Sequence, residues 1–174
     1  VVVMSIKVLI ADDHAILRQG IKRVLNFEED IEVVGEAEDG QEALARTLVV
    51  QPDILLLDLN MPGLTGLEVA NQLQAAKCKT KIIVLTIHDS DNYVLELLKN
   101  GVLGYLLKDV EPTMLIKAIH VVNEGNAFVY PRLAERLFGG GQGNGRAGIQ
   151  HGVVAAVVLH LPEGGILIGP LAGA

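Results

Sequence analysis

The feature of this sequence that most constrains its fold is an apolar run, Ile54–Leu57, that ends in a carboxylate, Asp58. Pro52 precedes the run and Pro62-Gly63 follows it, so the run has the length of a short strand. An uninterrupted apolar strand is buried on both faces, which is typical of a parallel sheet covered by helices. Because an unpaired buried carboxylate is costly, Asp58 is expected to meet a partner at this end of the sheet.

Three further apolar runs also end at polar residues. They are Val8–Ala11 before Asp12-Asp13, Ile82–Leu85 before Thr86, and Tyr105–Leu107 before Lys108. If these runs are parallel strands of one sheet, their carboxyl ends share one edge, which is where open α/β sheets bind ligands. The sequence therefore predicts a pocket in which three aspartates, a hydroxyl and an ammonium group converge.

Helical patterns alternate with these strands. Apolar residues at helical spacing predict helices at 14–26, 41–50, 66–76, 91–100 and 112–124, and one more strand is predicted at Ile31–Gly35. Some of the helix ends are marked by Gly or Pro, namely Pro52, Gly101, Pro112 and Gly125. Five strand–helix units predict an α/β fold, a doubly wound (βα)5 flavodoxin-like sandwich with a parallel five-stranded sheet in the order 2-1-3-4-5. In that order the first and third strands are neighbours, so Asp12, Asp13 and Asp58 are expected side by side.

The character of the sequence changes after the last predicted helix. Residues 4–125 are expected to form the α/β domain, residues 126–138 a linker helix, and residues 139–174 a Gly-rich apolar tail. Within the tail, Val153–Leu161 and Ile166–Ile168 could pair as a hairpin, and the alternative is a loosely packed or disordered segment. Met4 is the expected natural start.

Composition and charge narrow the class of protein and its partners. The 174-residue chain carries a net charge of −7 at pH 7, with a sequence pI near 5.2, which argues against a nucleic-acid surface and favours protein or cation partners. No apolar run reaches the roughly 18 residues that span a bilayer. The single cysteine, Cys78, excludes an internal disulfide and a Cys-based metal site. We therefore expect a cytoplasmic protein without a membrane partner.

The carboxylates at the predicted edge indicate a divalent cation. Two carboxylates about 4 Å apart repel by roughly 4 kcal/mol at an effective dielectric constant of 20, and one lysine offsets only part of this. Mg²⁺ prefers oxygen ligands, so Asp12, Asp13 and Asp58 suit it. Zinc is not expected, because the histidines show no ligand spacing; they are His14, His88, His120, His151 and His160. The first two of these are expected only at the rim of the pocket.

The same groups suit phosphoryl transfer. Its transition state spreads negative charge over three equatorial oxygens, and a cation, an ammonium group and a hydrogen-bond donor stabilise that charge. Lys108 and Thr86 supply the last two. Aspartate can act as the nucleophile and carry an acyl phosphate. Asp58 is the expected nucleophile, because it ends the central strand.

Taken together, these motifs resemble the receiver domain of bacterial two-component response regulators, a CheY-like domain. The resemblance covers roughly residues 5 to 125, and its motifs are Asp12-Asp13, Asp58-Leu59-Asn60-Met61-Pro62-Gly63, Thr86 and Tyr105-Leu106-Leu107-Lys108. Two longer segments are similar to the NarL/FixJ (LuxR-type) branch, whose members are mostly transcription factors. They are Ile10-Ala11-Asp12-Asp13-His14 and Gly104-Tyr105-Leu106-Leu107-Lys108-Asp109.

The resemblance implies a chemical role for the acidic residues. It implies that Asp58 accepts a phosphoryl group from a phosphohistidine on a sensor histidine kinase. It also implies that Asp13, Asp58 and the main-chain carbonyl of Asn60 ligate Mg²⁺ directly, and that Asp12 acts through a water molecule.

The resemblance further implies a switch. Lys108 would pair with the phosphoryl group, Thr86 would move to bond it, and Tyr105 would turn inward. Such a change would remodel the surface that carries Tyr105, and a phosphorylation-dependent homodimer is expected either through that surface or through the helices 14–26 and 112–124.

The resemblance does not extend to an effector. Members of this branch usually continue into a helix-turn-helix domain with basic residues, whereas residues 139–174 show no helical periodicity and contain one arginine, Arg146. We expect either that an effector has been replaced by unrelated sequence or that none belongs here. DNA binding is expected only through an effector that is not recognisable in this chain.

Plainer interpretations also exist. Taken singly, Asp12-Asp13 could cap a helix, Thr86 could be an ordinary strand-end hydroxyl, Tyr105 a half-buried strand residue and Lys108 a surface lysine. Two other functions stay open at this stage. One is a Mg²⁺-dependent phosphatase, although Asn60 stands where it would need a second acid. The other is a receiver-like interaction module that is not phosphorylated. Beyond self-phosphorylation and autodephosphorylation, no enzyme activity is expected.

Overall fold

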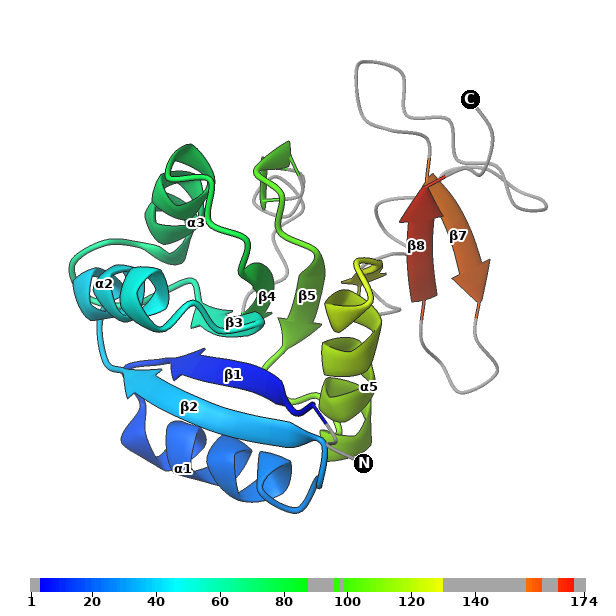
Figure 1. Ribbon diagram of the computed structural model, residues 1–174, viewed down its shortest axis with the longest axis horizontal. Helices are drawn as coiled ribbons and strands as arrows, with labels where there is room; N and C mark the ends of the chain where they lie inside the picture. Colours follow the sequence, from blue (N-terminus) through cyan, green and yellow to red (C-terminus); the bar gives the residue numbers. More distant parts are fainter. Residues whose placement is uncertain (1–3, 88–95, 98, 130–155, 161–165, 171–174) are drawn as a thin grey trace.

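A sheet with helices on both faces forms the centre of the computed structural model, which describes residues 4–87, 96–97, 99–129, 156–160 and 166–170 (Figure 1). The first five strands are β1 (Ile6–Ala11), β2 (Ile31–Ala37), β3 (Ile54–Asp58), β4 (Lys81–Thr86) and β5 (Gly104–Leu107). The helices are α1 (Ala15–Leu25), α2 (Gly40–Val50), α3 (Gly66–Ala75) and α5 (Pro112–Asn123). The strands and helices alternate along the chain as the sequence predicts.

Alternate residues of the central strands form two separate cores. On one face, Leu55 and Leu57 of β3 pack with Ala43 of α2 and with Val69 and Leu73 of α3. The opposite core is built from β1, β3, α1 and α5 and includes Val8, Ile10, Ile54, Leu56, Ile21, Leu25, Leu115 and Ile119. Successive strand side chains point to opposite faces, so a strand between two helical layers must be apolar throughout. Each such fully buried side chain contributes about 1.5–3 kcal/mol.

The predicted strand order is confirmed for the first five strands, which lie in the order β2-β1-β3-β4-β5 and pair in parallel. Ala11 of β1 is opposite Leu57 of β3, and Asp58 is opposite Leu85 of β4. The strands therefore end nearly level. This alignment brings the polar residues that follow the apolar runs to one edge of the sheet.

The sheet contains more strands than the five that the sequence predicts. A short strand β6 (Ala127–Val129) pairs in parallel with β5, and β8 (Ile166–Pro170) pairs antiparallel with both β6 and β7 (Ala156–His160). The prediction of a linker helix over residues 126–138 is wrong at its start, since residues 127–129 are a strand. Phe128 and Val129 are fully buried, and the amide of Phe128 donates to the carbonyl of Leu103 at 2.8 Å. β7 lies within the segment Val153–Leu161 and β8 begins with the segment Ile166–Ile168, so the two tail strands form the hairpin that the sequence allows, with β8 two residues longer. The domain limits themselves stay predictions.

One predicted helix, 91–100, lies mostly outside the described residues. Of its residues, Glu96, Leu97 and Lys99 are helical, and Gly101 then adopts a positive φ of 79°. A left-handed residue after a helix is a common helix end, and glycine adopts this conformation without strain. Among the helices of the described part of the chain, none is both long and apolar enough to cross a membrane.

Candidate functional site

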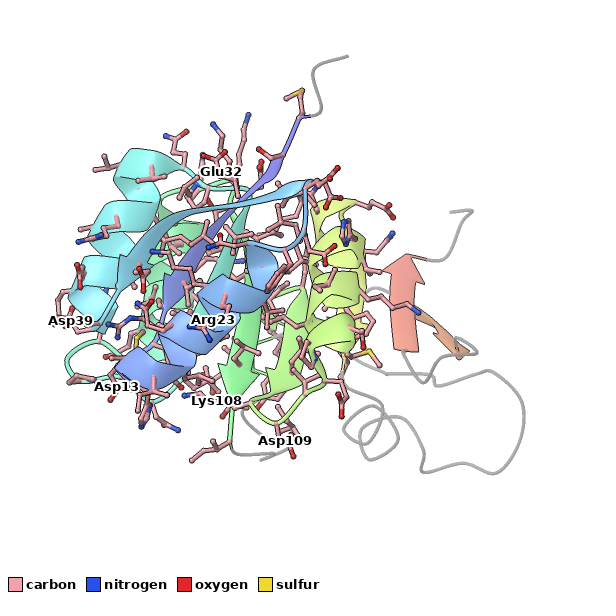
Figure 2. All side chains as sticks on the ribbon, turned by 90° about the horizontal axis from the view of Figure 1, so that it is seen from below. Asp13, Arg23, Glu32, Asp39, Lys108 and Asp109 are labelled. Carbon is pink, nitrogen blue, oxygen red and sulfur yellow. The ribbon has the colours of Figure 1, made fainter. Side chains whose placement is uncertain are left out.

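Four side chains meet at the carboxyl edge of the sheet, and we refer to them as the acidic cluster. They are Asp12, Asp13 and His14, which follow β1, and Asp58, which ends β3. One ligand atom from each lies within 4.8 Å of all the others. Asp12 and Asp58 are buried, whereas Asp13 and His14 are exposed. Figure 2 shows Asp13 and Lys108 at the same end of the molecule, opposite the end that carries Glu32.

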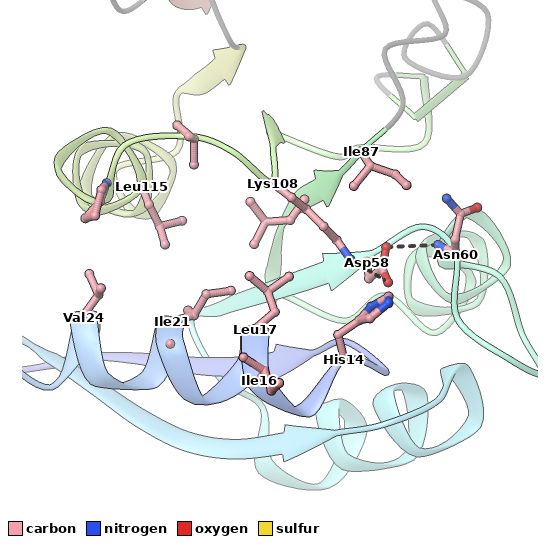
Figure 3. A pocket seen from close by; sticks show the side chains of 14 residues that line it. His14, Ile16, Leu17, Ile21, Val24, Asp58, Asn60, Ile87, Lys108 and Leu115 are labelled. Atoms are coloured by element: carbon pink, nitrogen blue, oxygen red, sulfur yellow. Dashed lines mark hydrogen bonds and ion pairs between the residues drawn. The ribbon is translucent and has the colours of Figure 1, made fainter.

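Lys108 joins the two buried carboxylates. Its Nζ lies 2.7 Å from Oδ2 of Asp12 and 3.1 Å from Oδ2 of Asp58, and its side chain is 10% exposed. The position of Lys108 is fixed by its own backbone, because its amide donates to the carbonyl of Thr86 at 2.9 Å and so continues the pairing of β4 with β5. One ammonium group therefore faces two carboxylates in a buried position, and Figure 3 shows it directed at Asp58.

The charges of this site alter each other's protonation. Burial raises the pKa of Asp58, and the neighbouring Asp12 raises it further, while hydrogen bonds from the Asn60 amide and Lys108 lower it. For Lys108, burial lowers the pKa, but hydrogen bonds to Asp12 and Asp58 outweigh burial, so its pKa is raised. The acidic cluster contains three carboxyl groups, whereas Lys108 supplies a single ammonium group.

His14 lies at the exposed rim of the cluster and contacts two of its carboxylates. Its Nδ1 lies 3.1 Å from Oδ1 of Asp12 and 3.1 Å from Oδ1 of Asp13, and its amide donates to Oδ1 of Asp12 at 2.8 Å. Its side chain is 68% exposed, so it covers the cluster from the solvent side. The interpretation of Asp12-Asp13 as helix caps is wrong, because His14 is the N-cap residue of α1. His88 lies outside the described residues.

Arg18 is a residue of this region that the sequence analysis missed. Its guanidinium is buried and donates to the main-chain carbonyl of Asp12 at 2.6 Å and to Oε1 of Glu38 at 2.8 Å, with Glu36 3.5 Å away. Arg18 thereby ties the start of the acidic cluster to β2 and to the residue that follows it. A signal was present, because Arg18 shares the buried face of α1 with Ile21 and Leu25, three and seven residues further on.

The remaining predicted site residues lie around Asp58. Asn60 is exposed, and its amide donates to Oδ1 of Asp58 at 3.2 Å. Thr86, at the end of β4, is completely buried, and Tyr105 of β5 is 1% exposed within the core on the α2 and α3 side. The structure thus gathers all the predicted site residues at or near one edge, and the roles of Thr86 and Tyr105 stay predictions.

The chemistry of the cluster fits a hard divalent cation. Oδ2 of Asp12 and of Asp58 are buried, and each forms an ion pair with Lys108 but has no further hydrogen-bond partner among the described residues. Carboxylate oxygens that face a common space are the ligands that Mg²⁺ prefers. The nitrogen of His14 would be an unusual ligand for Mg²⁺, so the three carboxylates are the better donors.

Comparison with known proteins agrees with the fold. Residues 8–120 match the response regulator receiver domain family, and the chain belongs to that family. It is 40% identical over 133 residues to the transcriptional regulatory protein DegU of Brevibacillus brevis, and 40% identical over 132 residues to the oxygen regulatory protein NreC of Staphylococcus carnosus. The alignments cover 76% and 75% of this chain, but 56% of DegU and 61% of NreC. The chain therefore spans less than two thirds of the length of these relatives.

Solved structures give the same result. The signal receiver domain of the response regulator NarL from Mycobacterium tuberculosis superimposes with a TM-score of 0.68 at 35% sequence identity, covering 70% of this chain and 98% of that domain. A LuxR-family response regulator from Aurantimonas superimposes with a TM-score of 0.71 at 28% identity, covering 76% of this chain and 95% of that one. The resemblance to the NarL branch and to transcription regulators is confirmed, and a phosphorylation-dependent signalling role follows from the family.

Proposed function

We propose that Asp58 is the phosphoryl acceptor of this receiver domain and that a phosphohistidine of a sensor histidine kinase is its donor. The observation that carries the proposal is the contact of one buried ammonium group, Lys108, with both Asp58 and Asp12 at the carboxyl edge of the sheet. A carboxylate so placed has an oxygen for attack and a fixed cation beside it for the phosphoryl oxygens. The kinase partner and the cytoplasmic location belong to this proposal and rest on the family.

In this proposal a divalent cation, Mg²⁺, would be held by Asp13, Asp58 and the main-chain carbonyl of Asn60, and Asp12 would assist through a water molecule. The acidic cluster has three carboxyl groups and only Lys108 places an ammonium group against them among the described residues, and this excess of carboxyl groups supports the assignment. When bound, Mg²⁺ supplies positive charge that offsets the repulsion between the carboxylates and the incoming phosphoryl group.

The protein's own residues then have distinct tasks. An oxygen of Asp58 attacks phosphorus, the bond between phosphorus and the imidazole nitrogen of the donor breaks, and the imidazole leaves with the electron pair. Lys108 exchanges its contact with Oδ2 of Asp58 for a phosphoryl oxygen. The amide of Asn60, already directed at Asp58, keeps the acceptor carboxylate in place.

The output of the switch is also part of the proposal. Thr86 moves to donate a hydrogen bond to the phosphoryl group, and the space that it leaves is taken up by Tyr105, which lies on the adjacent strand. This changes the surface around β5 and α5 and favours a homodimer. The proposed output is control of transcription through an effector domain, and the relative DegU is named a transcriptional regulatory protein.

The test is Mg²⁺-dependent labelling of the full chain by acetyl phosphate, read as a mass increase of one phosphoryl group. Asp58→Asn is expected to abolish the label. The matched control is Asp53→Asn, which makes the same change at the opposite end of the same strand, where Asp53 accepts a hydrogen bond from the Lys7 amide. Equal labelling of Asp58→Asn and the parent chain would refute the assignment. A folded parent chain that takes no label with Mg²⁺ would instead favour an interaction module that is not phosphorylated.

A further inference from the structure

The two outermost strands of the described sheet, β2 and β7, differ in how well they are protected against pairing with another chain. β2 carries Glu32 and Glu36, and its register with β1 shifts between Val8 and Leu9. Charged residues and an irregular register are means by which edge strands avoid further pairing. β7 contains no Asp, Glu, Lys, Arg or Pro, and it pairs with β8 over all 5 of its residues without a shift. β7 therefore has the properties of an edge that accepts another strand.

The direction of the backbone groups in β8 follows from its pairing with β6. The amide of Phe128 donates to the carbonyl of Leu103, so the backbone groups of Phe128 face β5 and those of the residues on either side of it face β8. These two flanking residues lie opposite Ile166 and Ile168, whose backbone groups therefore face β6. Because the direction alternates along a strand, the backbone groups of Leu167 face β7.

The same alternation fixes the outward side of β7. Leu159 lies opposite Leu167, so the backbone groups of Leu159, and of Val157 two residues before it, face β8. The backbone groups of Ala156, Val158 and His160 face the other way, and we call these three the outward residues. No described strand pairs with this side of β7, which is the last strand of the sheet (Figure 1). The outward residues therefore present a row of amide donors and carbonyl acceptors.

We propose that β7 pairs in antiparallel orientation with β7 of a second copy of this chain, so that the two sheets join across a two-fold axis. An antiparallel edge is complementary to itself, because each strand offers the donors and acceptors that the other needs. The register that uses all of β7 places Val158 opposite Val158 of the second copy, and Ala156 opposite His160. Every outward residue then finds a partner.

The occupant is a second copy because of the charge of the tail and the nature of the other edge. Residues 139–174 contain only Arg146 and Glu163 as charged residues, and neither lies in β7, so the strand carries no charge pattern that selects a different partner. The protected edge at β2 cannot continue the pairing, so association ends at a closed dimer and does not produce a filament. The pairing uses no residue of the acidic cluster, so it is independent of the proposed function.

The first test is sedimentation of the full chain at increasing concentration, without a phosphoryl donor. We expect a reversible monomer–dimer equilibrium. Val158→Pro removes the central N–H group of both copies, hence two hydrogen bonds per dimer, and should raise the dissociation constant at least about tenfold. Val158→Thr keeps the N–H group and a β-branched side chain, and its dissociation constant should stay within about threefold of the parent value. A monomeric parent chain, growth beyond the dimer, or equal dissociation constants for the parent and Val158→Pro would overturn the inference.

The stability of the Val158→Pro monomer checks the direction of the backbone. Proline is tolerated on an edge strand where its missing N–H group would face solvent, so the urea midpoint of the monomer should equal that of the parent. A large fall in the midpoint would mean that this N–H group is needed within the chain, and the inference would be overturned. Asp58→Asn should dimerise like the parent. A dimer that forms only after labelling by acetyl phosphate would overturn the inference and leave the proposed function intact.

The second test uses charge at the proposed centre of the dimer. Val158→Lys and Val158→Glu each place like charges opposite one another, so each variant alone should dimerise more weakly than the parent. A mixture of the two should form a heterodimer at least about threefold more tightly than either variant pairs with itself. The matched control makes the same two substitutions at Val49, which is 83% exposed on α2, and its mixture should show no preference. Equal preference at both positions would overturn the inference.

The third test is amide hydrogen exchange, which reads alternate residues of β7 separately. The amides of Val157 and Leu159 should be protected at every concentration, because they face β8. The amide of Val158 should gain protection only as the dimer forms. Free exchange of Val158 at high concentration, or equal exchange of all three amides, would overturn the inference.

Discussion

Removal of Lys108 should destabilise the protein strongly in the absence of a divalent cation. With Nζ at 2.7 Å from Asp12 and 3.1 Å from Asp58, the two attractions amount to about 6 and 5 kcal/mol at an effective dielectric constant of 20. Burying the ammonium group itself costs several kcal/mol, which the variant recovers. The net loss of unfolding free energy in Lys108→Met is therefore expected to be about 3–5 kcal/mol, as is usual when one partner of a buried charge pair is removed.

The assay is urea unfolding at pH 7 followed by circular dichroism, once with EDTA and once with excess Mg²⁺. Lys7→Met is the matched control, because Lys7 is exposed on β1 and its loss should change the unfolding free energy by less than about 0.5 kcal/mol. Mg²⁺ should stabilise Lys108→Met more than the parent chain, since in the parent the ammonium group competes with the cation for Asp12 and Asp58. A loss below about 1 kcal/mol in EDTA, or equal stabilisation of both chains by Mg²⁺, would refute this reasoning.

Three further predictions follow from contacts around the sheet. His120→Gln should lower the unfolding free energy by up to about 1 kcal/mol near pH 5.5 and by less at pH 8.5, measured by urea unfolding. Burial lowers the pKa of His120, but hydrogen bonds to Asp30 and to a main-chain carbonyl outweigh it, so the pKa is raised overall. The stability that protonated His120 contributes is therefore present below the pKa of the unfolded chain and is lost as pH rises through the folded pKa. His120 in turn lowers the pKa of Asp30, so the stability that ionised Asp30 contributes is lost only in acid. Gly104→Ala should cost about 1–3 kcal/mol, since the new Cβ would lie 2.6 Å from Cγ1 of the buried Ile83. Arg18→Met should raise the Mg²⁺ concentration needed for half-maximal acetyl phosphate labelling by about tenfold. The variant loses the hydrogen bond from Arg18 to the main-chain carbonyl of Asp12, and losing a group that orients a metal ligand usually weakens metal binding by this much.

Each of these predictions has an outcome that would contradict it. A His120 effect that grows from pH 5.5 to pH 8.5 would show that the ion pair with Asp30 is not its cause. An unchanged unfolding midpoint in Gly104→Ala would mean that the strand moves away from Ile83 without cost. If Arg18→Met loses stability but keeps the parent's Mg²⁺ dependence, Arg18 supports the fold and does not position the acidic cluster.

Much of the fold could be predicted from local patterns. The apolar run Ile54–Leu57 requires helices on both faces of the sheet, and this requirement together with the alternation of strands and helices fixes the class of fold. The boundaries of α1, α2, α3 and α5 are reproduced within one residue, and Pro52, Pro112 and Gly125 mark the end of α2 and both ends of α5. The strand β6 was not predicted, since its three residues give too short a pattern to separate a strand from a linker helix.

Part of the candidate site could also be predicted from local patterns. Residues that directly follow an apolar run, such as Asp58 and Lys108, are placed by the strand itself. Arg18 is placed instead by the packing of α1 against the sheet, which turns its guanidinium toward the carbonyl of Asp12. Spacing along the chain does not carry that information.

The sequence by itself determined that carboxylates, a hydroxyl and an ammonium group would meet at one edge of a parallel sheet. The reason is that the apolar runs show where each strand ends, and their alternation with helices indicates that the strands are parallel. Only the tertiary structure decided that a single ammonium group lies between Asp12 and Asp58, that Arg18 fixes the neighbouring backbone, and that an apolar cavity leads into the same site. The physical reason is that distances and cavities depend on how α1 and α5 pack against the sheet, and that packing joins residues about a hundred positions apart in the chain.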